Sequence, residues 1–155
     1  MSTPFRNVDV DASLPLDQWP YEALMTLLER GSIGDWAQIS AAIAADPWGE
    51  VARQVEDYLT YSRPYGVASL LERAISRARS DREDIERAEV AGQVRELVRQ
   101  SGLSTADFAT RIGTSRSRLS TYRSGKVIPS ATLMARMHWL VDRQTHGESR
   151  AHTAS

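Results

Sequence analysis

The stretch over residues 104–129 constrains the fold more than any other part of the chain, because its helix-capping and helix-ending residues predict two short helices joined by a tight turn. Ser104 is a typical N-cap residue, whose hydroxyl can accept a backbone N–H at a helix start. Gly113 supplies the left-handed residue that commonly ends a helix. The pattern therefore predicts helices over about residues 105–112 and 115–124.

The apolar residues of these two helices recur at helical spacing, so each helix has one face to bury. Ala109 lies where the two helices should approach most closely, and a larger side chain there would displace the second helix. Gly125 and Pro129 should stop that helix. The residues expected to build the motif are Phe108, Ala109, Ile112, Gly113, Leu119, Tyr122, Gly125 and Pro129.

The charge of the chain is distributed unevenly, although its net value is only -1. Residues 1–60 carry ten acidic groups and three arginines, whereas residues 95–126 carry seven basic groups and two acidic ones. The basic excess therefore coincides with the helix pair. Two helices joined in this way can project the start of the second into a DNA major groove, and a basic patch favours contact with phosphates.

The spacing of these landmarks resembles the Cro/XRE family, the lambda-repressor-like DNA-binding domains. The resemblance covers about Ile85 to Val141. It implies an all-α domain that binds double-stranded DNA through the second helix of the motif. The residues that carry the resemblance are Ala109, Gly113, Leu119, Gly125 and Pro129.

The resemblance also implies roles for individual polar residues. Those expected to read bases are Arg116, Ser117 and Thr121. Those expected to contact phosphates are Thr105, Thr114, Ser115, Arg118, Arg123 and Lys126. The family usually has glutamine at the position of Thr105 and glutamate at that of Arg123, so this chain offers a shorter polar side chain and a more basic surface. Helix pairs of this kind also occur in bundles that bind no DNA, but the coincident basic excess favours the DNA-binding interpretation.

The rest of the chain predicts an all-α architecture, because its apolar residues follow helical periods. We expect a flexible lead over residues 1–12, an acidic helical domain over 13–80 for dimerisation or partner binding, the DNA-binding domain over 81–143 and a disordered tail over 144–155. In the acidic domain, Asp35 should cap the second helix and Pro47 should open the third.

The connection between the two expected domains allows two interpretations. Ser80 and Glu83 have the spacing of a capping box, which predicts a new helix there, but one long helix bent at Ser80 fits equally well. In either case Ile85, Ala88, Ala91, Val94, Leu97 and Val98 should face the core of the DNA-binding domain.

The composition argues against several other functions. The chain has no cysteine and three scattered histidines, so we expect no metal site, no cofactor and no enzymatic activity. Asp81, Glu83, Asp84 and Glu86 are interleaved with arginines and fit a solvated helix face better than a cation site. We find no signal segment and no apolar run long enough to span a bilayer, so a cytoplasmic location is expected.

These observations predict a sequence-specific transcriptional regulator, expected to bind double-stranded DNA as a homodimer. Two alternatives remain open. In the first, the chain is an antitoxin whose acidic domain binds a toxin while the DNA-binding domain represses the shared operon. In the second, the motif is a purely structural module that binds protein. The tryptophans and tyrosines of the first half could form a partner surface, but core packing is the more common role for them.

Overall fold

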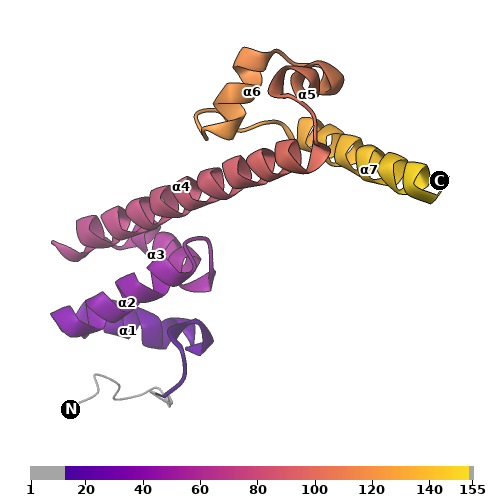
Figure 1. Ribbon diagram of the computed structural model, residues 1–155. Helices are drawn as coiled ribbons and strands as arrows, with labels where there is room; N and C mark the ends of the chain where they lie inside the picture. The colour runs from indigo at the N-terminus through magenta and orange to yellow at the C-terminus, as the bar shows by residue number, and fades with distance from the viewer. Residues whose placement is uncertain (1–12, 154–155) are drawn as a thin grey trace. The chain divides into compact units, whose positions relative to one another are not determined.

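The computed structural model describes residues 13–153, and the predicted flexible lead over 1–12 lies outside this part of the chain. The described residues form seven α-helices and one short 3-10 helix, with no strand, which confirms the all-α class (Figure 1). The chain divides into two compact units, of which the first ends at Glu83 and the second begins at Asp84. No described helix is both long enough and apolar enough to cross a membrane.

The N-terminal unit packs its helices around one continuous apolar core. Leu24, Leu28, Ile39 and Val55 are completely buried in it, as the helical spacing of these residues requires. The elements of this unit are η1 (Leu16–Gln18), α1 (Tyr21–Arg30), α2 (Ile33–Ala45), α3 (Glu50–Tyr61) and the first part of α4 (Val67–Ser101).

Two predicted helix starts in this unit are wrong. Helix α2 is capped by Ser32 and not by Asp35, whose carboxylate instead accepts the Ser32 backbone N–H at 2.8 Å in a capping box. Helix α3 begins three residues after Pro47, because Gly49 N–H donates to the Asp46 carbonyl at 3.0 Å and closes a turn first. Both errors arise where several residues compatible with a helix start lie close together.

Helix α4 runs without interruption from Val67 to Ser101. The connection is therefore one long helix, and no new helix begins at Ser80. Residues 80–90 are almost entirely exposed, between the last buried residue of the first core, Ala78, and the first of the second unit, Ala91. Ile85 and Ala88 are therefore not in a core as predicted. The segment contains neither proline nor glycine, so nothing in it ends the helix.

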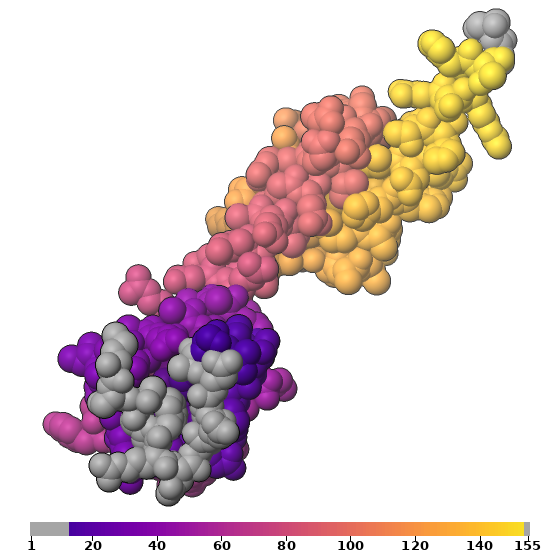
Figure 2. Space-filling model, turned by 90° about the horizontal axis from the view of Figure 1, so that it is seen from below, coloured from indigo at the N-terminus to yellow at the C-terminus, as the bar shows by residue number. Residues whose placement is uncertain are grey.

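The C-terminal unit packs the last turns of α4 with α5 (Thr105–Ile112), α6 (Arg116–Arg123) and α7 (Ala131–Thr153). We expected α7 to end near Arg143 and the tail over 144–155 to be disordered, but the helix continues to Thr153. Its last turns bury nothing, and their side chains project into solvent (Figure 2). A helix without a buried face leaves no apolar period in the sequence, which explains why it was missed.

Candidate nucleic-acid interface

The first helix of the motif is fixed at both ends by the residues predicted to do so. Ser104 Oγ accepts the Asp107 backbone N–H at 3.1 Å at the start of α5. Gly113 follows its end with φ 79° and ψ 32°, in the left-handed region that favours glycine. The Arg136 guanidinium, on α7, donates to the Ile112 carbonyl at 3.1 Å, so a third element also holds this end.

The second helix of the motif, α6, rests on two buried side chains. Leu119 is fully buried and Tyr122 is 6% exposed, and both join the core with Phe108 and Ile112 of α5. Ser115 caps α6, with its Oγ accepting the Arg118 backbone N–H at 3.1 Å. Ala109 is 1% exposed, in keeping with a close approach of the two helices.

The residues predicted to read bases differ in how accessible they are. Arg116 and Ser117, in the first turn of α6, are exposed. Thr121 is half-buried, and its hydroxyl donates to the Arg118 carbonyl at 2.6 Å. Its proton is therefore already used, which leaves the oxygen lone pairs and the methyl group for a ligand. The base-reading roles of all three remain predictions.

The residues predicted to contact phosphate also differ in whether their side chains already bind another residue of the unit. Arg123 Nη1 donates to Thr105 Oγ1 at 3.4 Å and links the end of α6 to the start of α5, while its buried Nε has no hydrogen-bond partner among the described residues. Arg118 Nε donates to the Tyr122 hydroxyl at 3.2 Å on its own helix. Lys126 is exposed, and its ammonium forms no hydrogen bond or ion pair with a described residue. Thr114 and Ser115 lie in the turn before α6, where Thr114 is half-buried.

The segment after α6 folds back against the rest of the unit. Gly125 has φ 79°, in the left-handed region that favours glycine, and a Cβ built there would make an ordinary van der Waals contact of 3.5 Å with the Cβ of Ala91 on α4. Val127 N–H donates to the Thr121 carbonyl at 3.2 Å, and Pro129 is buried. Gly125 and Pro129 thus lie where the predicted stop requires them.

Two arginines that hold the motif together were not predicted. Arg95 Nη1, on α4, donates to the Arg123 carbonyl at 2.6 Å and so fastens the end of α6. Arg136 caps α5 as described above. Both are contacts between residues more than 20 positions apart, for which the spacing of the sequence gives no signal. The acceptors of both guanidinium groups are neutral backbone carbonyls, so these hydrogen bonds do not cancel the positive charge of the arginines.

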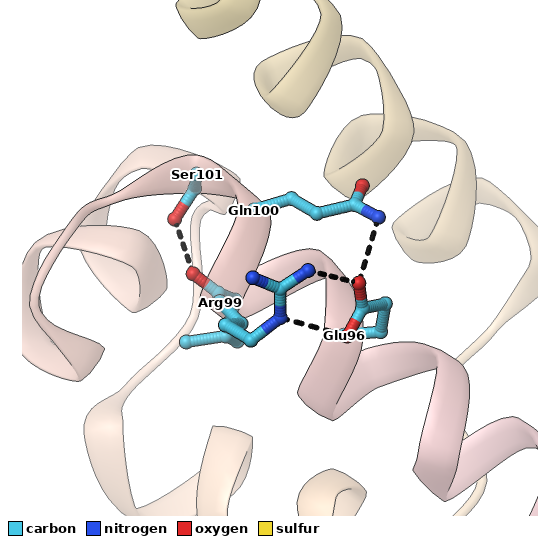
Figure 3. A network of polar contacts seen from close by, with 5 residues as sticks. Glu96, Arg99, Gln100 and Ser101 are labelled. Carbon is cyan, nitrogen blue, oxygen red and sulfur yellow. Dashed lines mark hydrogen bonds and ion pairs between the residues drawn. The ribbon is translucent and has the colours of Figure 1, made fainter.

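One arginine near the end of α4, Arg99, is neutralised by an ion pair with Glu96 (Figure 3). The Arg99 guanidinium donates to both carboxylate oxygens of Glu96, at 2.9 and 2.5 Å, and Gln100 donates to the same carboxylate at 2.9 Å. The hydrogen bonds from Arg99, followed by that from Gln100, lower the pKa of Glu96 to about 2. Ser101 then ends the helix, with its hydroxyl donating to the Val98 carbonyl at 2.6 Å.

The described residues contain no group of three or more histidine, aspartate or glutamate side chains arranged to hold a metal ion. The chemistry of the unit is that of hydrogen-bond donors and positive charge. Arg116 and Ser117 at the exposed start of α6, and Lys126 beyond its end, can donate hydrogen bonds to base edges and phosphate oxygens.

Comparison with known proteins supports this assignment for one part of the chain. Residues 89–141 match the family model described as a helix-turn-helix domain. Neither the curated proteins nor the solved structures contain a match to this chain. The matched residues comprise the end of α4, all of α5 and α6 and the first half of α7. Residues 89–141 are therefore a helix-turn-helix domain in the C-terminal part of an all-α chain.

Proposed function

We propose that the chain is a sequence-specific regulator of transcription that binds double-stranded DNA through α6. The exposed first turn of α6 carries this proposal, because Arg116 and Ser117 project from a helix whose other face is anchored by Leu119. An α-helix fits the major groove, where each base pair presents a distinct pattern of donors and acceptors. The guanidinium of Arg116 can donate two hydrogen bonds to a guanine edge.

The contacts around α6 suggest a division of labour among the polar residues. Lys126 is free to bind phosphate, and phosphate contacts fix the register of a protein on DNA without reading sequence. Arg118 and Arg123 are already hydrogen-bonded within the unit, so their share is to raise the local positive potential unless DNA displaces these bonds. Occupancy of the operator would then exclude or recruit polymerase in the cytoplasm.

A homodimer is the form in which such a regulator would read an operator. Two copies related by a two-fold axis place their recognition helices in successive major grooves, roughly 34 Å apart. The operator would then be an inverted repeat with half-sites about one helical turn apart.

Selection of bound duplexes from a random library by the full-length chain tests the proposal. We expect enrichment of an inverted repeat, and titration of the enriched duplex should show affinity falling steeply with salt, since each neutralised phosphate contributes about -0.9 to the slope of log K against log salt. Failure to enrich any sequence, together with affinity that does not depend on salt, would contradict it.

A further inference from the structure

The N-terminal unit contains a groove of about 830 Å³ between α3 and α4. Its apolar part is formed by Leu59 and Ile75, which belong to the core of the unit and are 6% and 5% exposed. Thr60 and Ser76 also line it. The groove is made only of residues from the first unit, so it is separate from the helix-turn-helix domain.

Two ion pairs border this groove, and one of them links its two walls. Arg79, on α4, donates to both carboxylate oxygens of Glu56, on α3, at 2.5 and 3.0 Å, and its Nε donates to the Pro47 carbonyl at 2.9 Å. Arg63 forms a second pair with Glu72 at 2.6 Å. Both guanidinium groups are thus already neutralised, so the groove offers no free positive charge to an anionic ligand.

The charge that remains available in the groove is negative. Glu83 lines it and forms no ion pair with a described residue. The surrounding unit is acidic as well, since residues 13–83 carry eleven acidic groups and seven arginines. A partner that carries lysine or arginine would therefore meet a favourable potential and one unpaired carboxylate.

An exposed aromatic side chain extends the apolar surface at the Arg79 side of the groove. Trp48 is 45% exposed, and the Arg79 guanidinium lies 5.7 Å from the centre of its ring. Tryptophan and arginine are among the residue types most often found at energetically important positions of protein interfaces. An apolar floor with a polar, paired rim is also the usual anatomy of such an interface.

We propose that this groove binds a basic amphipathic helix of a partner protein. The apolar stripe of the helix would lie on Leu59 and Ile75, and a lysine or arginine on its polar face would pair with Glu83. Recognition of this kind uses anchors at i, i+3 or i+4, and i+7 of the bound helix. The site is independent of DNA binding, so it would let the chain engage a protein and DNA together.

Selection from displayed helical peptides of about 16 residues, roughly four turns, tests this inference on the full-length chain. We expect the enriched peptides to combine a helical apolar stripe with net positive charge. The tightest peptide is then synthesised, and its affinity is measured by fluorescence anisotropy. The variants compared are Ser76→Arg and Glu83→Arg in the groove and Ala41→Arg outside it, all at exposed positions.

Both groove substitutions should weaken the peptide by at least about tenfold, because they add bulk or like charge where it binds. The Ala41→Arg control and the DNA affinity of all three variants should stay at wild-type values, and circular dichroism should show unchanged helix content. Enrichment of acidic peptides, no enrichment, or equal affinity for Ser76→Arg would overturn the proposal. Self-association that Ser76→Arg abolishes in ultracentrifugation would also overturn it, since a second copy would then occupy the groove.

Discussion

The two units use arginine side chains to join their helices in different ways. In the N-terminal unit, Arg79 of α4 pairs with Glu56 of α3, and Arg63 in the turn before α4 pairs with Glu72, so both links are electrically neutral. In the C-terminal unit, Arg95 and Arg136 donate to backbone carbonyls, and Arg123 donates to a hydroxyl. The same residue type thus holds both units together, but only the second keeps the positive charge of these residues uncompensated.

This difference shows how a chain with a net charge of only -1 can contain a surface suited to a polyanion. Carbonyl and hydroxyl acceptors satisfy the donors of a guanidinium without cancelling its charge. The C-terminal unit therefore gains both cohesion and positive potential from the same arginines. The N-terminal unit has excess carboxylates instead, which fits a protein partner better than DNA.

The largest expected effect is a loss of stability on truncating a core side chain. It tests whether the two units have separate cores, as the comparison between them assumes. We expect Leu119→Ala to cost the C-terminal unit about 2–5 kcal/mol, because it leaves a cavity at a fully buried position. Leu28→Ala is the matched change in the N-terminal unit, since Leu28 is also fully buried. Hydrogen exchange should show lost protection in α5 and α6 for the first variant and in α1 to α3 for the second. Equal loss in both units from either variant would show that the cores are not separate.

The next effect tests whether the uncompensated charge is used to bind DNA. Arg116→Ala should cost about 1–3 kcal/mol on the preferred duplex and relax the preference at one base pair. Lys126→Ala should weaken all duplexes alike and reduce the salt slope by about one phosphate contact. Arg150→Ala, at an exposed position near the end of α7, is the matched control and should change neither. Affinity and slope come from fluorescence anisotropy at several salt concentrations.

A smaller effect concerns the turn that orients α6. Gly113 has φ 79°, so Gly113→Ala should destabilise the C-terminal unit by about 1–2 kcal/mol. Gly147→Ala is the contrasting change, because Gly147 lies within the exposed part of α7 and a Cβ there meets no atom within 4 Å. It should instead stabilise the helix by up to about 1 kcal/mol. Urea denaturation of both variants measures this, and destabilisation by Gly147→Ala would contradict a helix that continues past Arg143.

The helix-turn-helix could be predicted in detail because its signals are local. Ser104 and Gly113 form the start and the end of α5 through contacts within one helical turn. Leu119 and Tyr122 follow the helical spacing of a buried face, and both are buried. The same reasoning placed the caps of the N-terminal unit less well, since Ser32 and Asp35 are both good cap residues. Only the geometry of the capping box shows which of them starts α2.

The features that the sequence could not reveal depend on distant contacts or on the lack of burial. Arg95 and Arg136 bind carbonyls of other helices, and no spacing rule connects a guanidinium to a carbonyl 24 or more residues away. Ile85 has the correct period for a core position but lies where α4 has no neighbouring element to cover it, at 49% exposed. Periodicity indicates a face, but only the fold determines whether something packs against that face.

The smallest expected effect concerns the Glu96–Arg99 ion pair of the C-terminal unit, which resembles the pairs of the N-terminal unit. Hydrogen bonds from Arg99 lower the pKa of Glu96 from its ordinary value of 4.5 to about 2. The lowered pKa means that the carboxylate favours the folded state above its unfolded pKa, and that this contribution is lost as the pH falls from about 4.5 to 2.

Carboxyl NMR titration of the full chain should therefore give Glu96 a midpoint near 2, and Arg99→Gln should return it toward 4.5. Stability at neutral pH should change little, since both side chains are largely exposed and exposed pairs contribute weakly. An unshifted midpoint in the wild-type chain would mean that Arg99 is not held by Glu96 in solution. Arg99 would then join the uncompensated arginines of this unit, and the contrast between the two units would be sharper than the structure shows.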